Sequence, residues 1–239
     1  MMRVCILGEK GMLGHMLRRY LSSVGVQVLY CDGRWPDTLK NNLLSMEFEY
    51  LINCIASIPN KSIDFKINYE LPIWLDENIN CSGIILPGTD ATTETEYGKS
   101  KFIATDYMMK IGKRTKVIQC SIIGPEMIGS ASLFQWFFDS DHSVEGYSNI
   151  HWNGITSLKW AGLAHHLISD WGKHEALILP YTDTITKYQL LLNIKEIWGL
   201  STEVAPVTYG EKNYFPVQGN LKTESIKNQL SDLKNFYYI

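Results

Sequence analysis

A short apolar run followed by three spaced glycines constrains the fold of this chain more than any other feature. Residues 4–7 read as a buried strand, and Gly8, Gly11 and Gly14 follow it directly. Apolar residues then recur at helical spacing up to Gly25: Met12, Leu13, Met16, Leu17, Tyr20 and Leu21. The chain therefore begins with a strand, a glycine turn and a helix.

The glycine loop predicts a site for a dinucleotide. Glycines at this spacing let the backbone turn tightly and approach a pyrophosphate, while the amides and dipole at the start of the helix attract its negative charge. A glycine pattern between a first strand and a helix is the usual context of such a site. The predicted phosphate-binding residues are Gly8, Lys10, Gly11, Met12, Leu13 and Gly14.

Asp32 and Arg34 bear on which dinucleotide binds. Residues 26–31 read as a second strand. The acidic Asp32 follows it at about 20 positions past the glycines, where a dinucleotide fold binds the ribose hydroxyls of NAD. Arg34 could instead receive the phosphate of NADP, and Asp32 could be only a turn residue before Gly33. The choice between the two cofactors stays open.

Short apolar segments continue to alternate with helical patterns up to residue 120. This order favours a parallel sheet with right-handed crossovers and helices on both faces. The sequence therefore predicts an α/β fold with a Rossmann-type doubly wound parallel sheet. The expected helices span residues 39–48, 67–78 with Pro72 in the first turn, and 97–111, and the expected strands span residues 50–55, 82–86 and 116–120.

Small and polar residues follow the ends of the predicted strands. Because ligands bind at the carboxyl edge of such a sheet, we expect these residues to meet in one site. Beyond the glycine loop and Asp32, they are Asn53, Cys54, Ala56, Thr89, Asp90, Ser121 and Ile122.

A tyrosine and a lysine four residues apart stand where the fourth predicted helix begins. Positions i and i+4 share one helix face, so the Lys101 ammonium can sit beside the Tyr97 phenol. A nearby cation favours the phenolate and lowers the pKa of a tyrosine. Tyr97 is therefore a candidate general acid/base, although the same spacing also arises at ordinary helix starts.

The chain changes in character after residue 125, where aromatic residues gather beside asparagine and glycine. Such a mixture suits a pocket that stacks on a base or sugar and offers hydrogen bonds, and it also suits a hydrophobic cap over the sheet. The candidate substrate-binding residues are Asp90, Trp136, Tyr147, Asn149, Trp152 and Asn153.

We expect two parts in the chain. Residues 1–125 form the dinucleotide-binding domain, and residues 126–239 form a small C-terminal substrate-binding lobe. The second part is expected to contain a returning strand at 176–179 and helices at 156–169, 186–198 and 223–234.

The composition favours a small-molecule ligand. The chain has 239 residues, a net charge of −3 and no block of basic residues, so neither nucleic acid nor a membrane is an expected partner. The lack of a long apolar run leads us to expect a cytoplasmic protein. Five cysteines read as buried thiols. The six histidines scatter, and the adjacent His165 and His166 point in different directions, so no metal site is expected.

With these motifs placed, the chain resembles the extended short-chain dehydrogenase/reductases, and within them the branch around dTDP-4-dehydrorhamnose reductase. The similarity covers most of the chain, and several motifs in order are more specific than any one of them. They are Gly8-x-x-Gly11-Met12-Leu13-Gly14, Ile52-Asn53-Cys54, Ile67-Asn68, Thr89-Asp90, Tyr97-Gly98-Lys99-Ser100-Lys101, Ser121-Ile122-Ile123-Gly124 and the runs 144–156 and 185–188.

The resemblance implies an NAD(P)H-dependent reductase of a nucleotide-linked 4-keto-6-deoxy sugar, of the kind found in surface-polysaccharide pathways. It implies that Tyr97 protonates the oxygen formed at the C4 ketone, that Lys101 holds the nicotinamide ribose and lowers the pKa of Tyr97, and that Thr89 hydrogen-bonds the substrate carbonyl. NADPH or NADH is the implied cofactor and a nucleotide sugar the implied substrate. A homodimer is one open option for the assembly.

One departure from the family concerns the residues before Tyr97. Family members usually have a much longer loop between the threonine and the tyrosine, whereas only residues 91–96 separate Asp90 from Tyr97 here. Six residues can span up to about 20 Å, so the connection can still be made. Two alternatives follow: a non-catalytic NAD(P)-binding regulatory subunit, and a nucleotide-sugar epimerase or dehydratase with tightly bound NAD.

Overall fold

The computed structural model describes residues 2–59, 63–211, 215–216 and 218–237. The chain divides into two compact units, one of Met1–Gln119 with Ala161–Ile178 and one of Cys120–Trp160 with Leu179–Ile239. The first unit therefore ends earlier than the expected boundary at residue 125. It also takes back a later segment, which the sequence analysis had assigned to the second part.

The first unit contains the predicted doubly wound sheet, which is confirmed. Six parallel strands lie in the order β10-β5-β4-β3-β1-β2. Their bounds are β1 Arg3–Leu7, β2 Gln27–Tyr30, β3 Tyr50–Asn53, β4 Gly83–Pro87, β5 Thr115–Ile118 and β10 Leu177–Ile178. Because β2 and β3 flank β1 on opposite sides, the strand order reverses at β1, and a crevice for a ligand forms at such a point.

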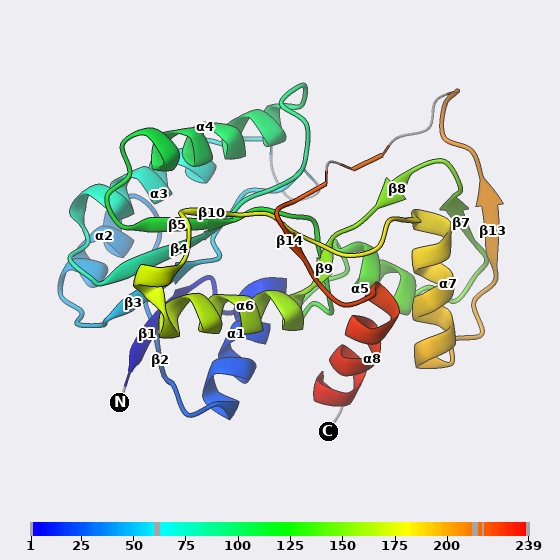
Figure 1. The fold of residues 1–239 in the computed structure, drawn as a ribbon, viewed down its shortest axis with the longest axis horizontal. Helices are drawn as coiled ribbons and strands as arrows, with labels where there is room; N and C mark the ends of the chain where they lie inside the picture. The colour runs from blue at the N-terminus through cyan, green and yellow to red at the C-terminus, as the bar shows by residue number, and fades with distance from the viewer. Residues whose placement is uncertain (1, 60–62, 212–214, 217, 238–239) are drawn as a thin grey trace. The chain divides into compact units, whose positions relative to one another are not determined.

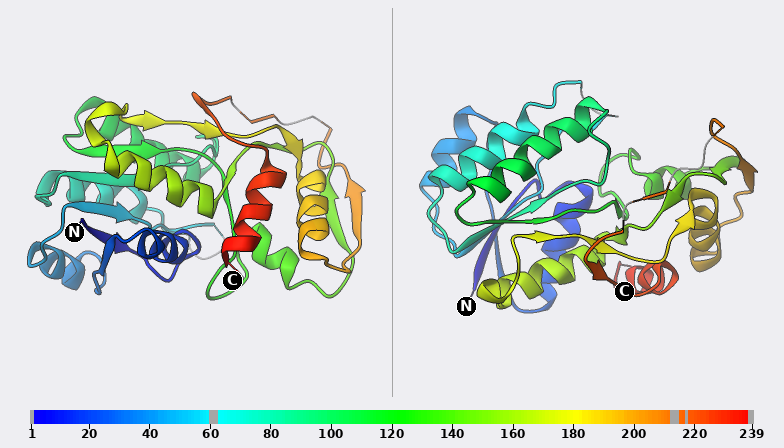
Figure 2. Two further views of the ribbon diagram at one scale, coloured as in Figure 1. Left: turned by 60° about the horizontal axis from the view of Figure 1, so that its bottom comes forward. Right: turned by 45° about the horizontal axis from the view of Figure 1, so that its top comes forward.

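Helices cover both faces of this sheet. In two views, α2, α3 and α4 lie on one face, and α1 and the part of α6 that belongs to this unit lie on the other (Figures 1 and 2). Their bounds are α1 Met12–Ser23, α2 Asp37–Leu44, α3 Ile67–Asn78, α4 Glu96–Lys110 and α6 Ser157–Ser169, followed by the 3-10 turn η1 Trp171–Lys173. Pro72 lies inside α3 rather than in its first turn, because the helix already begins at Ile67.

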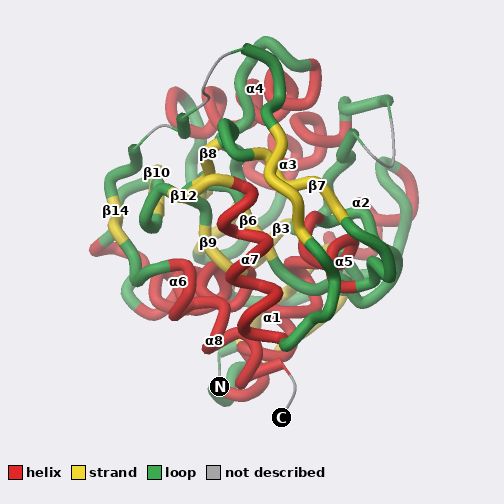
Figure 3. The backbone as a smooth tube through the Cα atoms, turned by 90° about the vertical axis from the view of Figure 1, so that its right-hand side faces the viewer, coloured by secondary structure: helices red, strands yellow, loops and turns green. Residues whose placement is uncertain are grey.

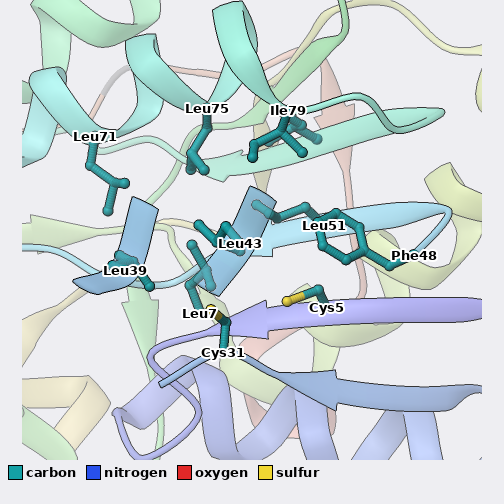
Figure 4. Packing of buried hydrophobic residues seen from close by; sticks show 11 residues of the cluster. Cys5, Leu7, Cys31, Leu39, Leu43, Phe48, Leu51, Leu71, Leu75 and Ile79 are labelled. Atoms are coloured by element: carbon teal, nitrogen blue, oxygen red, sulfur yellow. The ribbon is translucent and has the colours of Figure 1, made fainter. Parts of the chain in front are cut away.

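The core of this unit lies between the strands and the helices α2 and α3. Figure 4 shows Leu51 of β3 level with Leu43 of α2, with Leu75 of α3 above them and Cys5 of β1 below. All four side chains are almost fully buried. Burial of apolar area of this kind holds the strands in register and fixes where their carboxyl ends lie.

The second unit consists of short strand pairs and three further helices. Its core joins Phe134, Trp152, Leu190 and Leu230, and α7 is the helix that faces the viewer in Figure 3. The helices are α5 Leu133–Phe138, α7 Lys187–Trp198 and α8 Ile226–Tyr237, and the strands are β6 Ile122–Ile123, β7 Val144–Tyr147, β8 His151–Trp152, β9 Ile155–Thr156, β11 Pro180–Tyr181, β12 Ile185–Thr186, β13 Val204–Val207 and β14 Leu221–Lys222. Among the described residues, we find no helix with the length and apolar character that crossing a membrane requires.

Candidate active site

The glycine loop packs tightly against the end of β3. Gly8 has a φ of +75°, and a Cβ there would lie 3.1 Å from the carbonyl carbon of Cys54. A Cβ on Gly14 would lie 2.1 Å from the Gly8 carbonyl oxygen, closer than atoms can approach. The first glycine is therefore needed for the turn and the third for the packing of α1 on β1.

The N-terminus of α1 is open to an anion. Its N-cap residue, Gly11, provides no side-chain cap, and the first turn holds no acidic residue. Met12 is half-buried and Leu13 buried, so their backbone amides, rather than their side chains, are the groups that a phosphate would use. Lys10 is exposed, with its ammonium 3.9 Å from a carboxylate oxygen of Glu9.

Asp32 and Arg34 follow β2, next to the strand that carries the glycine loop. Both side chains are exposed. The Asn42 side-chain amide donates to the Asp32 backbone carbonyl, and the Arg34 backbone amide donates to the Thr38 hydroxyl. Either side chain can therefore meet a ribose or its phosphate. The preference between NADH and NADPH stays unpredicted.

The residues after β3 form the other wall of the glycine loop. Asn53 is 1% exposed, and its Oδ1 accepts a hydrogen bond from the Ile55 amide. Its Nδ2 is buried and makes no hydrogen bond with any described residue. Cys54 is half-buried and Ala56 exposed. A buried amide without a partner costs free energy, which a ligand that accepts a hydrogen bond would recover.

Thr89 and Tyr97 meet at the carboxyl edge of the sheet. The Thr89 hydroxyl lies close enough to the Tyr97 phenol to lower its pKa, but burial has a larger effect, and with the nearby Asp90 carboxylate it leaves the pKa of Tyr97 raised above its ordinary value. The Phe65 ring packs edge-on against Tyr97, with 6.0 Å between ring centroids. A threonine donor and a tyrosine acid are thus paired.

Lys101 lies one helical turn after Tyr97 in a buried position. It is 6% exposed, and its Nζ donates a hydrogen bond of 2.9 Å to the Pro87 carbonyl. Burial lowers the pKa of Lys101 to about 8, and Cys54 opposes the shift. The expectation that Lys101 lowers the pKa of Tyr97 is not met, because the ammonium is directed to Pro87 and burial dominates at the phenol.

Threonine hydroxyls close the short connection between Asp90 and Tyr97. The Ala91 amide donates to the Thr89 hydroxyl, the Thr95 hydroxyl donates to the Thr92 carbonyl, and the Gly98 amide donates to the Thr95 hydroxyl as a helix N-cap. A Cβ on Gly98 would lie 2.0 Å from the Thr92 carbonyl oxygen. Residues 88–95 therefore join β4 to α4 through turns and still leave Thr89 beside Tyr97.

A buried amide that the sequence analysis quoted only as a family marker fastens this site together. Asn68 accepts a hydrogen bond from the Ser57 amide and donates to the Ser57 carbonyl and to the Ser100 hydroxyl. Ser100 in turn donates to the Tyr97 carbonyl. The network links the loop after β3 to the start of α4. No periodicity marks such a residue; a polar residue on the buried face of α3 is the only sequence signal.

Eight predicted site residues do not all serve one site. Asp90 is exposed beside Tyr97. Ser121 and Ile122 fall in the second unit, where the Ser121 carbonyl and strand β6 pair with β9. The remaining predicted substrate residues, also in the second unit, are Trp136, Tyr147, Asn149, Trp152 and Asn153.

Two of these aromatics line a pocket and the other residues support the fold. Trp136 and Tyr147 border a cavity of about 440 Å³ that also touches Glu145 and Lys187. By contrast, Trp152 is buried in the core of the second unit. Asn149 and Asn153 are also buried, and the amide of Asn149 exchanges two hydrogen bonds with the Tyr209 backbone. Trp152 therefore belongs to the core of the second unit, whereas Trp136 and Tyr147 line a pocket of the same unit.

The fold and the glycine loop define a Rossmann-fold chain with a dinucleotide-type loop and a tyrosine-lysine helix. Among solved structures it is similar to a dTDP-4-dehydrorhamnose reductase ortholog from Clostridium acetobutylicum, with a TM-score of 0.78 and 14% identity over 100% of both chains. It is also similar to a Bacillus anthracis dTDP-4-dehydrorhamnose reductase in complex with NADP, with a TM-score of 0.73 and 13% identity over 98% of both chains.

A Thermus thermophilus UDP-glucose 4-epimerase in complex with NAD is similar as well, with a TM-score of 0.71 and 16% identity over 99% of both chains. No family model and no curated protein matches the sequence. At these identities the likeness shows the fold, which confirms at that level the expected resemblance to the extended short-chain dehydrogenase/reductases.

Proposed function

We propose that this chain is an NAD(P)H-dependent reductase of a nucleotide-linked 4-keto-6-deoxy sugar, similar to dTDP-4-dehydrorhamnose reductase. The observation that carries the proposal is that the Thr89 hydroxyl lies close enough to the Tyr97 phenol to lower its pKa, with Lys101 one turn further along α4. A donor and an acid at one point are what the reduction of a carbonyl requires, because negative charge develops on a single oxygen.

The residues present fit a nicotinamide dinucleotide. The pyrophosphate would lie against the glycine loop and the uncapped start of α1. A Cβ at Gly14 would fill this space. Asp32 or Arg34 would meet the adenosine ribose, and the unpaired Asn53 amide offers a buried donor. When bound, NADH or NADPH supplies the hydride.

Side chains of the protein would donate the proton and stabilise the negative charge that develops on the substrate oxygen. Thr89 would donate a hydrogen bond to the substrate carbonyl, and Tyr97 would give its phenolic proton to that oxygen. A raised pKa keeps the phenol protonated at neutral pH, as a general acid must be. Lys101 has three N–H donors, so its bond to Pro87 leaves donors for the nicotinamide ribose.

The pocket of the second unit, taken by itself, has groups that suit a nucleotide or a sugar. Trp136 and Tyr147 offer aromatic faces for a base or a sugar, and Lys187 offers a cation for phosphate. The named relatives act on dTDP- and UDP-linked sugars, which supports a nucleotide sugar as the substrate class.

The experiment is a turnover assay with a panel of dTDP- and UDP-linked 4-keto-6-deoxy sugars. We expect stoichiometric oxidation of NADH or NADPH with at least one member, followed through the absorbance of the reduced nicotinamide. A chain that binds neither cofactor by calorimetry would rule out the proposal.

The short connection before Tyr97 favours one second candidate, a non-catalytic NAD(P)-binding subunit. Residues 91–95 form turns held by Thr92, and α4 begins directly after them at Glu96. Cofactor binding without turnover of any sugar in the panel would support that candidate. Conversion of a sugar without net oxidation of added cofactor would instead point to an epimerase or dehydratase, the activity of one structural neighbour.

A further inference from the structure

Two histidines and an aspartate gather where α6 gives way to the sixth strand of the sheet. The side chains of His166, Asp170 and His174 each place one ligand atom within 4.8 Å of the others. The two imidazole rings lie edge to face with their centroids 4.7 Å apart. The sequence analysis missed this group because it compared His166 only with its neighbour His165.

The backbone explains why residues four apart converge. The Asp170 amide donates to the His166 carbonyl, which continues the helix by one turn, and the Lys173 amide donates to the Asp170 carbonyl in the 3-10 turn. His166 and Asp170 therefore share a helix face. The tight turn then brings His174 back to the same place.

The turn is held by packing, so the three ligands rest on a fixed frame. Trp171 lies against Gly83, where a Cβ would be 2.2 Å from its ring, and it packs on Tyr50 at 5.4 Å between centroids. Lys116 of β5 hydrogen-bonds the His174 carbonyl. Because this packing already orders the turn, the chain loses less conformational entropy when an ion binds.

The groups around the cluster leave His174 ready to bind a cation. Its Nε2 is buried and has no hydrogen-bond partner among the described residues. Lys173 holds an Asp170 oxygen at 2.7 Å, but its side chain is 76% exposed, so a cation can displace it.

We propose that His166, Asp170 and His174 form a site for a divalent first-row transition metal, with Zn²⁺ as its occupant. Two imidazoles and a carboxylate suit zinc, whereas magnesium and calcium prefer sets made only of oxygen atoms. Zinc binds such ligands at about 2.0–2.2 Å. His166 is exposed and Asp170 half-buried, so both side chains can rotate to close the remaining distance, with water completing the tetrahedron.

The metal would be structural. His174 precedes β10, so the cluster lies at the amino edge of the sheet, whereas the glycine loop and Thr89 follow the carboxyl ends of their strands. Zinc bound by these three residues would connect the end of α6 and the following 3-10 turn to β10, the edge strand of the sheet. The proposal is therefore independent of the reductase proposal.

The test is calorimetric titration of Zn²⁺ into the tag-free, chelator-treated full chain, with thermal unfolding as a second readout. We expect one ion per chain and a midpoint that rises by about 5 °C at a hundredfold excess over Kd. No binding, or one ion shared by two chains, would overturn the proposal.

Three variants locate the site. His166→Gln, at an exposed position that folding does not require, should weaken zinc binding by roughly tenfold or more, as should Asp170→Asn. Lys173→Ala should tighten it, because it removes the competing ammonium. His165→Gln is the matched control. The His165 ring lies on the neighbouring face of the helix, where it contacts Tyr20. Equal binding by His166→Gln and wild type, or equal loss in His165→Gln, would contradict the assignment.

Discussion

At the scale of single residues, the proposed chemistry depends on one interaction, between Thr89 and Tyr97. A compact run of threonine turns connects β4 to α4 and leaves the Thr89 hydroxyl beside the Tyr97 phenol. The short connection therefore keeps the donor and the acid together.

Replacing Thr89 separates the hydroxyl from the shape of the side chain. Thr89→Val keeps the volume and removes the donor, so kcat/KM should fall roughly tenfold to hundredfold, the value of one hydrogen bond to developing charge. Thr89→Ser keeps the hydroxyl and should retain most of the activity. Steady-state kinetics with the sugar identified by the panel would check this, and equal activity of the valine and serine variants would remove Thr89 from the mechanism.

Lys101 should make stability depend on pH in a particular direction. Its pKa falls from 10.5 to about 8 in the folded chain, so between these values the unfolded chain binds more protons and the free energy of unfolding rises with pH. The total rise is about 3 kcal/mol. Below pH 8 the buried charge is a cost, and Lys101→Met should therefore be more stable than wild type at pH 7.

Denaturant unfolding from pH 7 to 9 measures this effect. Cys5 and Cys54, whose pKa values are raised to about 12, lower stability only above pH 9, so their effect falls outside this range. Lys110→Met on the same helix is the control, because Lys110 is exposed in its pair with Asp106. An unchanged pH dependence in Lys101→Met would refute the burial argument.

At the scale of elements, the glycine loop unites turn, strand packing and anion binding. Gly14→Ala places a methyl group 2.1 Å from the Gly8 carbonyl oxygen, so α1 must shift away from β1. We expect loss of cofactor binding and a thermal midpoint several degrees lower.

A second glycine on a helix provides the comparison. A Cβ on Gly162 would lie 3.6 Å from the Tyr20 hydroxyl, an ordinary contact, so Gly162→Ala should be neutral or slightly stabilising through helix propensity. Thermal unfolding and cofactor calorimetry on both variants decide the point. Similar behaviour of the two variants would mean that the close approach at Gly14 has no role.

The helices and strands were predicted better than the side-chain environments. Hydrophobic periodicity located every strand of the large sheet, and the structure has β3 at Tyr50–Asn53 and α4 at Glu96–Lys110 close to where the spacing put them. Side-chain environments were less predictable. The helical spacing brought Lys101 near Tyr97, but only the fold shows that burial raises the pKa of Tyr97 and that Asn68 fastens the loop.

At the scale of the whole molecule, the chain leaves its first unit after residue 119 and returns to it for Ala161–Ile178. The short apolar run at 177–178 does not reveal which strand it pairs with, because its partner β5 lies some sixty residues earlier in the chain. The same limit hid the metal cluster and the burial of Trp152: each depends on contacts between residues that are distant in the sequence or on a turn that periodicity does not reveal.

The two units should respond differently to the cofactor. If the dinucleotide binds as proposed, NADPH should slow hydrogen exchange in residues 8–14, 53–57 and 97–101 of the first unit and leave α7 and α8 of the second unchanged. Exchange followed by mass spectrometry resolves these segments. Protection limited to the second unit would contradict the proposed cofactor site.

The most direct test of the central claim is the Tyr97→Phe variant, because it removes only the phenolic oxygen. We predict that the cofactor Kd measured by calorimetry is unchanged while kcat for the nucleotide-linked 4-keto sugar falls by about 10²- to 10⁴-fold, the usual contribution of a positioned general acid. Turnover equal to that of wild type would contradict the account.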